Sequence, residues 1–281
     1  MLIWGSTWLA IKYQLGVVPP AVSVMWRFVL AALMLLAFAK YKRLRLRFGP
    51  RDHIWLGLQG LSMFGINYVA VYLAEQYLPS GLVALIFSLM AFLNIVFMRL
   101  FFGTPIRSRD IVGAGIGITG VALVFWPEVA QFSASGNELI GLIYALGSTV
   151  VASLGTMVAT RNHRAGLPVV QVNGWGMLYG AIFVALYAAL DGDRLQFDWS
   201  YPYVVSLIYL ALFGSVLAFG AYITLMGRIG AGRAGYASVA IPVVALMLST
   251  LVEGLRWQIV MVTGIALCLA GNLLVLSRRK A

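Results

Sequence analysis

Long apolar runs separated by short polar stretches occupy almost the whole chain. Read as windows bounded by charge, proline and glycine, they predict ten helical spans, near residues 2–18, 22–39, 54–74, 80–101, 110–126, 139–160, 168–190, 202–225, 234–252 and 258–276. A transmembrane helix needs about 20 mostly apolar residues to cross about 30 Å of hydrocarbon. The pattern therefore predicts an all-α, polytopic membrane protein with ten transmembrane helices.

The first of these runs is short for a full crossing. It carries Lys12 and lacks a small-residue cleavage site, so we expect it to remain in the membrane rather than act as a signal peptide. Either its start lies upstream of Met1 or the helix is thin at its cytoplasmic end.

Composition agrees with a membrane protein. Of the 281 residues, 62% are hydrophobic and 10% are charged, whereas an ordinary soluble domain has about 25% charged residues. The net charge of +11 would suggest a nucleic-acid partner in a soluble chain, but its distribution argues against one. Sixteen of the twenty basic residues lie in the connections after spans 2, 4, 6 and 8 and in the C-terminal tail, if Arg99 at the end of span 4 is counted with the connection that follows it. By the positive-inside rule, both termini are predicted to face the cytoplasm. We interpret the basic stretch 40–51 as a topology anchor, with a lipid-headgroup patch as the alternative.

Short motifs recur in order along the two halves of the chain. Gly5-Ser6-Thr7 recurs as Gly147-Ser148-Thr149, and Phe64-Gly65 recurs as Phe213-Gly214. Four glycines also recur 151 residues later: Gly81, Gly103, Gly113 and Gly120 as Gly232, Gly254, Gly264 and Gly271. A half with an odd number of spans forces the next half to enter from the opposite side. The series therefore predicts two inverted five-helix repeats around a central cavity, residues 1–130 and 137–277, followed by a basic cytoplasmic tail, 278–281.

This architecture favours transport. Two similar packings of opposite orientation give outward-open and inward-open states of comparable energy, as alternating access requires. The glycines themselves are better explained by close helix packing than by a direct role in transport.

Several motifs together resemble a known family. They are Ile3-Trp4-Gly5-Ser6-Thr7 with Ile11-Lys12, Arg27-Phe28, the segment 72–79, Ile241-Pro242 and Glu253-Gly254. In order and spacing they resemble the drug/metabolite transporter superfamily, in its ten-helix EamA branch, and most of all its bacterial amino acid exporters, including aromatic amino acid exporters. The first half departs from the family pattern, because Ala91 and Phe102 stand where Pro242 and Glu253 stand in the second.

The resemblance implies an inner-membrane carrier whose cavity is lined by spans 1, 3, 4, 6, 8 and 9. Its expected partners are a small amino acid-like substrate and the lipid bilayer, without nucleic acid, metal or cofactor. We expect a monomer, with a homodimer as the alternative.

Two basic residues inside the spans are the sharpest candidates for a role in transport. An ionisable group in hydrocarbon costs at least about 2.5–3.5 kcal/mol on insertion scales, so Lys12 and Arg27 should face a cavity or a partner. Lys12 is a candidate for the substrate site or a gate. Arg27 is favoured as a tie between helices, and Pro242 as a hinge, because proline removes a helical hydrogen bond.

Polar and aromatic side chains supply the other candidates for a substrate-binding cavity, with interhelical hydrogen bonding as the alternative for each. They are Trp4, Trp8, Asn67, Tyr68, Tyr72, Ser88, Asn94, Ser148, Ser153, Asn173, Trp175, Tyr179, Tyr222, Tyr236 and Ser238.

Acidic residues are missing from the middle of every predicted span, and Glu75 and Glu253 are placed at span edges. Proton relays and carriers of cationic drugs commonly need a buried carboxylate. We therefore expect a facilitator or exchanger of neutral or zwitterionic molecules, with a multidrug, nucleoside or sugar exporter of the same fold as the alternative.

Other classes of protein fit less well. An intramembrane lipid-modifying enzyme needs a nucleophile, a base or metal ligands within the spans, yet His53 and His163 fall in cytoplasmic connections and Cys268 has no neighbouring base. A channel usually lines its pore with rings of like groups. No glycine-rich phosphate loop of an ATP-driven pump is present.

Overall fold

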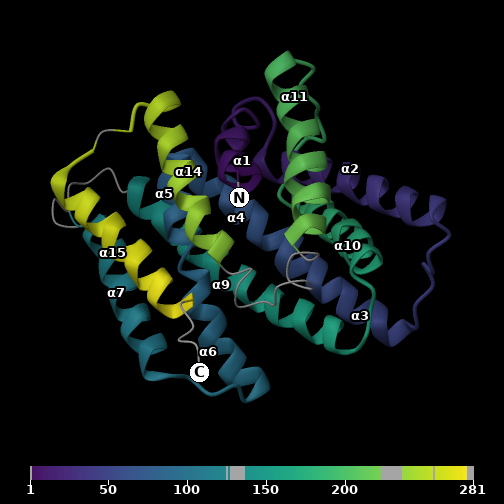
Figure 1. Cartoon of the computed structure of the whole chain (residues 1–281). Coiled ribbons are helices and arrows are strands. Elements are labelled where there is room, and N and C mark those ends of the chain that lie inside the picture. The colour runs from purple at the N-terminus through teal and green to yellow at the C-terminus, as the bar shows by residue number, and fades with distance from the viewer. Residues whose placement is uncertain (1, 125, 127–136, 223–235, 256, 277–281) are drawn as a thin grey trace. The chain divides into compact units, whose positions relative to one another are not determined.

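The computed structural model describes residues 2–124, 126, 137–222, 236–255 and 257–276, of which 236–240 and 276 are described by their backbone alone (Figure 1). All regular structure in these ranges is helical. The helices are α1 (Leu2–Lys12), α2 (Pro20–Tyr41), α3 (Pro50–Gln59), η1 (Gly60–Ile66), α4 (Asn67–Tyr77), α5 (Ser80–Phe87), α6 (Met90–Phe102), α7 (Ser108–Val124), α9 (Asn137–Arg164), α10 (Val169–Leu190), α11 (Tyr201–Tyr209), η2 (Leu210–Leu217), α14 (Tyr236–Val252) and α15 (Ile259–Leu276).

Six helical segments in the described part of the chain are long and apolar enough to cross a membrane. They are Pro20–Tyr41, Pro50–Tyr77, Ser80–Phe102, Asn137–Arg164, Val169–Asp191 and Tyr201–Tyr222. The other helices, α1, α7, α14 and α15, have 11, 17, 17 and 18 residues and overlap the remaining predicted spans, although α1 ends at Lys12, six residues before the predicted end of the first span. The chain is therefore an all-helical protein of the polytopic membrane type.

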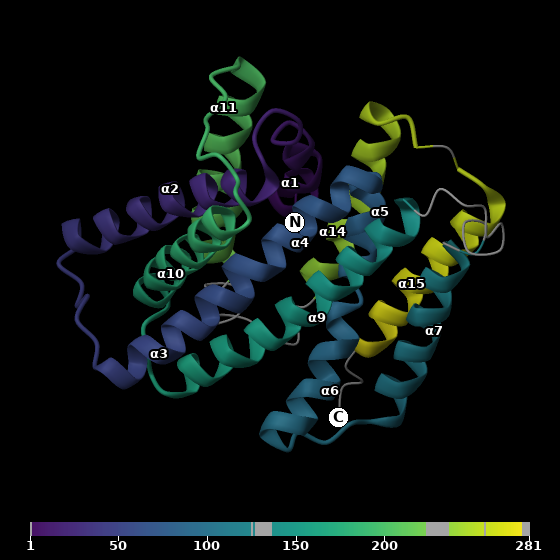
Figure 2. The same cartoon turned by 180° about the vertical axis from the view of Figure 1, so that it is seen from behind.

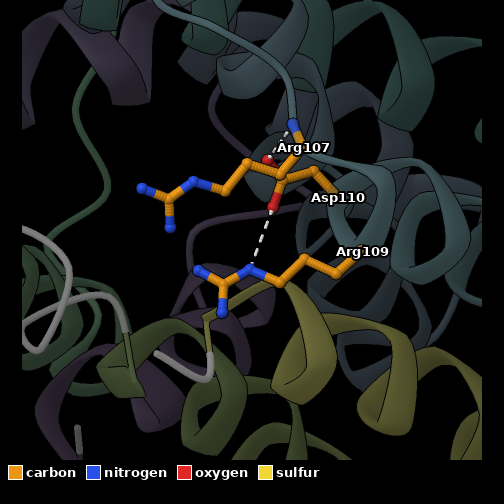
Figure 3. A network of polar contacts seen from close by, with 3 residues as sticks. All are labelled: Arg107, Arg109 and Asp110. Atoms are coloured by element: carbon orange, nitrogen blue, oxygen red, sulfur yellow. Dashed lines mark hydrogen bonds and ion pairs between the residues drawn. The ribbon is translucent and has the colours of Figure 1, made fainter. Parts of the chain in front are cut away.

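Helix starts follow local chemistry. Pro20 and Pro50 occupy first-turn positions, where a missing N–H leaves no helical bond unmade. At the start of α7, Asp110 accepts a hydrogen bond from the backbone N–H of Arg107 at 2.9 Å (Figure 3). The other oxygen of that carboxylate lies 3.8 Å from Nε of Arg109. The negative charge of Asp110 in the first turn also suits the helix dipole.

The helices form two compact units. The first, the α2–α10 unit, comprises residues 10–73 and 151–223. In it α2 packs along α10, η1 packs on α10 and η2 packs on α2. Figures 1 and 2 both show α2 and α10 side by side. Backbone approaches backbone at η1, because a Cβ added to Gly60 would lie 2.8 Å from the amide nitrogen of Gly180. Only glycine permits that approach.

The second, the α7–α15 unit, comprises residues 1–9, 74–150 and 224–281. In it α7 packs along α15 and α5 packs on α14, and both views show α7 beside α15 (Figures 1 and 2). Glycines form the contact between α7 and α15: a Cβ on Gly113 would lie 2.8 Å from the carbonyl oxygen of Gly271. Four glycines at helical spacing thus let these two backbones touch.

The chain passes from one unit to the other within helices α1, α4 and α9. The first and third boundaries, after Leu9 and after Val150, lie 141 residues apart, and the second and fourth, after Leu73 and after Ile223, lie 150 apart. Each unit therefore combines segments from both halves of the sequence.

Helix interiors differ from the sequence expectation in three places. The predicted span 80–101 is interrupted by a turn at Ser88 and Leu89, where the N–H of Leu89 bonds to Ile86 three residues back. Proline is not needed for this break, whereas α14 continues as a helix through Pro242. The remaining two are the π-helices η1 and η2, which start 150 residues apart. In a π-helix each N–H bonds to the carbonyl five residues back instead of four. In a span that is apolar on most sides, the hydrophobic pattern does not reveal this change.

Candidate functional site

Arg27 lies in α2 and is the largest fully buried side chain of the described protein, with 1% of its surface exposed. Its Nε donates a hydrogen bond to Oγ of Ser215 in η2 at 3.2 Å. The guanidinium carbon lies 4.5 Å from the centre of the Tyr68 ring and 5.4 Å from that of Phe28. Arg27 therefore joins α2 to both η2 and α4 through neutral groups.

Ser215 connects this cation to the irregular backbone of η2. Its hydroxyl donates to the carbonyl of Leu210, five residues back, at 3.0 Å. A carbonyl in a π-helix bonds five residues ahead rather than four, and such segments are frequent at functional sites. The contact places a buried charge next to the least regular part of the span.

The polar side chains of α4 differ in environment. Asn67 is buried and its amide donates to the carbonyl of Met63 at 3.1 Å. Tyr68 is half-buried against Phe28 and Arg27, whereas Tyr72 is fully buried. Glu75, expected at a span edge, lies two residues before the end of α4 with its side chain fully buried. The carboxylate is thus near the helix end in sequence but enclosed by protein.

Trp175 and Tyr179 belong to an aromatic group with His53. The Tyr179 hydroxyl lies 2.8 Å from Nδ1 of His53, and the rings of Trp175 and Tyr179 stack at 5.8 Å. Nε1 of Trp175 donates to the carbonyl of Leu46 at 3.0 Å. His53 was expected in a connection and lies instead in the first turns of α3.

An open, mostly apolar groove of about 500 Å³ adjoins this aromatic group on the α2–α10 unit. It is lined by Pro50, His53, Ile54, Gly57, Leu58, Leu61, Tyr179 and Phe183. Of the predicted substrate-site residues, Tyr179 alone lines it.

Two buried polar networks of the α2–α10 unit were largely missed by sequence reasoning, which had singled out only Asn173 among their residues. In one, Nε2 of Gln59 donates to Asn173 at 3.2 Å, and Asn162 donates to Oε1 of Gln59 at 2.9 Å, which joins α3, α9 and α10. The missed signals were Gln59, inside the predicted span 54–74, and Asn162, just after the predicted span 139–160.

In the other network, Nε2 of Gln14 donates to Oγ of Ser206 at 2.6 Å and to the carbonyl of Tyr203 at 2.9 Å. The Tyr203 hydroxyl also lies 3.0 Å from Oγ of Ser23. These bonds tie the chain that follows α1 to α11 and α2.

A third polar group lies in the α7–α15 unit, at the break between α5 and α6. Ser88 donates to the carbonyl of Leu85 at 2.6 Å, which satisfies one acceptor where the helix is interrupted. Asn272 of α15 donates to Oγ of Ser88 at 3.3 Å, and Sγ of Cys268 lies 3.4 Å from that hydroxyl. Ser88, a predicted site residue, therefore links the break between α5 and α6 to α15.

Glu253 caps a helix far away in sequence. Both of its carboxylate oxygens lie 3.1 Å from the backbone N–H of Ser80, the first residue of α5, and Ser80 Oγ donates to the same carboxylate. A carboxylate at a helix N-terminus satisfies an unpaired N–H and suits the dipole. The span-edge position predicted for Glu253 fits this contact between α14 and α5.

The remaining predicted residues occupy separate places. In the α7–α15 unit Trp8 is buried and meets Phe87 edge-on at 5.3 Å, Trp4 and Asn94 are half-buried, and Ser148 is buried and bonds back to Ala145. In the α2–α10 unit Lys12 and Tyr222 are half-buried and Ser153 is fully buried. Pro242 is buried in α14. The side chains of Tyr236 and Ser238 lie outside the described residues.

Among the described residues, no three His, Cys, Asp or Glu side chains are grouped closely enough to hold a metal ion. The buried polar groups of the described residues are mostly hydroxyls and amides, together with the guanidinium of Arg27, the carboxylate of Glu75 and the thiol of Cys268.

Apolar helical rods with isolated polar clusters inside them define a polytopic membrane protein. The chain belongs to the EamA-like transporter family, whose profile matches residues 1–126 and 139–277. It is 29% identical over 251 residues to the "Uncharacterized inner membrane transporter YedA" of Escherichia coli (strain K12), covering 89% of this chain and 79% of that protein. It is 24% identical over 294 residues to the "Probable amino-acid metabolite efflux pump" of the same organism, covering 100% and 94%. A solved crystal structure of a protein with 20% sequence identity matches with a TM-score of 0.71, covering 97% of this chain and 92% of that one, and supports the fold alone.

Proposed function

We propose that this protein is a secondary carrier that exports small metabolites, or facilitates their movement, and that its substrates are amino acids, including aromatic ones. Family membership supports transport, and the relative named as a probable amino-acid metabolite efflux pump, aligned over 94% of its length, supports the substrate class. Buried hydroxyls, amides and aromatic rings are the groups that such a solute needs.

Alternating access between two inverted five-helix repeats is the mechanism we propose. The observation that carries it is the pairing of helices that the repeat makes equivalent: α2 with α10, α5 with α14, and α7 with α15. A two-fold axis relating inverted halves brings equivalent elements together in this way. The matched starts of η1 and η2 add support, because both irregular segments follow the repeat.

Ten membrane crossings in the inner membrane, with both termini in the cytoplasm, complete the proposal. Six segments have the required length and apolar character, and the other four helices overlap predicted spans. A relative is named as an inner membrane transporter, and the loop charges favour the orientation.

Uptake into proteoliposomes tests the function and substrate class together. Purified protein is reconstituted and supplied with labelled amino acids, nucleosides and quaternary amines, each with unlabelled competitors. We expect saturable uptake of amino acids, strongest for aromatic ones, that persists without a pH gradient. Saturable uptake confined to nucleosides or quaternary amines would contradict the amino acid assignment. Strict dependence on a pH gradient would contradict facilitated movement and would direct attention to the buried Glu75.

A further inference from the structure

Arg27 is a buried cation whose described neighbours are all uncharged. Its side chain is 1% exposed, and its contacts are the Ser215 hydroxyl and the faces of two aromatic rings. None of these groups carries a negative charge. A buried cation without a counter-ion is costly, because desolvation is offset only by a well-placed opposite charge and full hydrogen bonding.

One nitrogen of the guanidinium is also left without a hydrogen bond. Nη1 of Arg27 is buried and has no acceptor among the described residues. Nε is engaged by Ser215, and the rings of Tyr68 and Phe28 lie against the group. The guanidinium therefore has an unused donor, Nη1, in its own plane, which is the direction from which arginine binds a planar anion.

We propose that Arg27 binds the carboxylate of the transported molecule. The inference rests on the proposed transport function and adds to it the substrate group that this residue recognises. A carboxylate neutralises one arginine charge for charge and matches its planar donor edge. A phosphate dianion would leave one negative charge without a partner in a low-dielectric site.

Ser215 provides a way for Arg27 to change partners without leaving a new unsatisfied group. Its hydroxyl proton goes to the carbonyl of Leu210, so the serine accepts from Arg27 while donating to η2. When Nε of Arg27 turns toward a carboxylate, the bond between Ser215 and Leu210 persists. Tyr68, at 4.5 Å, can keep its ring against the guanidinium during this exchange.

Ligand-induced thermal stabilisation of the purified protein tests this inference independently of transport. The probes are 3-phenylpropionate and its neutral amide, 3-phenylpropionamide, which share shape and differ in charge. We expect the wild-type protein to be stabilised by the carboxylate well above the amide. In Arg27→Gln the half-saturating concentration of the carboxylate should rise at least about tenfold, while the response to the amide stays unchanged.

Arg27→Lys is the matched variant, because it keeps the charge and loses the planar fork. It should retain a preference for the carboxylate with weaker binding than wild type. An equal response of the wild-type protein to acid and amide would overturn the proposal, and so would an undiminished preference in Arg27→Gln. If Arg27→Gln does not fold, the proposal is overturned by a wild-type protein that responds equally to acid and amide, or by an Arg27→Lys variant that binds the carboxylate as tightly as wild type.

Transport measurements separate this inference from the function on which it rests. An Arg27-dependent carboxylate preference in a protein that moves no amino acid would contradict the amino acid assignment and support the anion site. If Arg27→Gln still transports amino acids and still prefers acid over amide, the amino acid assignment is supported and the anion site at Arg27 is contradicted.

Discussion

Gly120 of α7 and Gly264 of α15 approach so closely that a Cβ on either would lie 2.5 Å from the carbonyl oxygen of the other. Gly113 meets Gly271 in the same face of contact. In the repeat, Gly264 corresponds to Gly113 and Gly271 to Gly120. Gly120 therefore packs against the counterpart of Gly113, and Gly113 packs against the counterpart of Gly120. Such exchange of partners is the mark of a two-fold contact between like surfaces, and it supports the proposed pairing of inverted halves.

Adding one methyl group at this contact should destabilise the protein. In Gly120→Ala the new Cβ overlaps backbone atoms of α15, so the helices must separate, at a cost of about 1–3 kcal/mol. Gly115→Ala is the control, because nothing lies within 4 Å of that position on the same helix. Thermal unfolding of the two purified variants should show a clear loss for Gly120→Ala and none for Gly115→Ala. Equal behaviour of the two would refute the close contact.

The carboxylate of Glu253 should stabilise the start of α5. In Glu253→Ala the N–H of Ser80 loses its acceptor, which should lower the free energy of unfolding by about 1–3 kcal/mol. Ser80→Ala removes the hydroxyl alone and keeps the N–H bonded, so it should cost less. Unfolding measured by denaturant titration in detergent micelles checks the order. A larger effect of Ser80→Ala would show that the hydroxyl, not the helix N-terminus, is the main partner of Glu253.

Pro242 should influence transport kinetics rather than folding. It lies inside a continuous helix, where proline removes a backbone hydrogen bond and makes bending easier. Pro242→Ala restores that bond and should slow transport severalfold while folded protein still reaches the membrane. Val243→Ala, at the exposed neighbouring position, is the control. Unchanged transport rates in Pro242→Ala would argue against a hinge.

Reporter fusions check the proposed orientation. Green fluorescent protein fused after Ala281 should fluoresce, because it folds in the cytoplasm, and alkaline phosphatase fused there should be inactive. Alkaline phosphatase inserted after Arg194, in a connection with acidic neighbours, should be active. The opposite pattern at both sites would reverse the predicted topology.

The positions of the helices could be predicted from the sequence, because they depend on the length of each apolar run and on the charges that flank it. The predicted span 168–190 coincides with α10, Val169–Leu190, and the span 54–74 falls inside the helical segment Pro50–Tyr77. Bends inside the spans were not accessible. The break at Ser88 and Leu89 occurs without proline, and the irregular backbone of η2 is stabilised by a hydrogen bond from Ser215 to Leu210. Both depend on packing and side-chain bonding rather than on hydrophobic period.

Site residues were partly accessible for the same reason. The insertion cost of a charge pointed to Arg27, which is fully buried and bonded to η2. The amide pair Gln59 and Asn162 was missed, because a single amide in or just after an apolar run carries no information about the partner that it meets across more than 100 residues of sequence. Burial of Glu75 was missed because position along a helix does not specify which side the residue faces.

Counterflow is the most direct test of the central claim that this protein is a carrier operating by alternating access. Proteoliposomes preloaded with unlabelled L-phenylalanine are diluted into a trace of labelled L-phenylalanine, and the label inside is followed over time. A carrier reorients faster with bound substrate, so we predict transient accumulation of label above the outside concentration, which is absent from protein-free liposomes. Equilibration of label without such an overshoot, equally fast from empty and preloaded vesicles, would contradict the account.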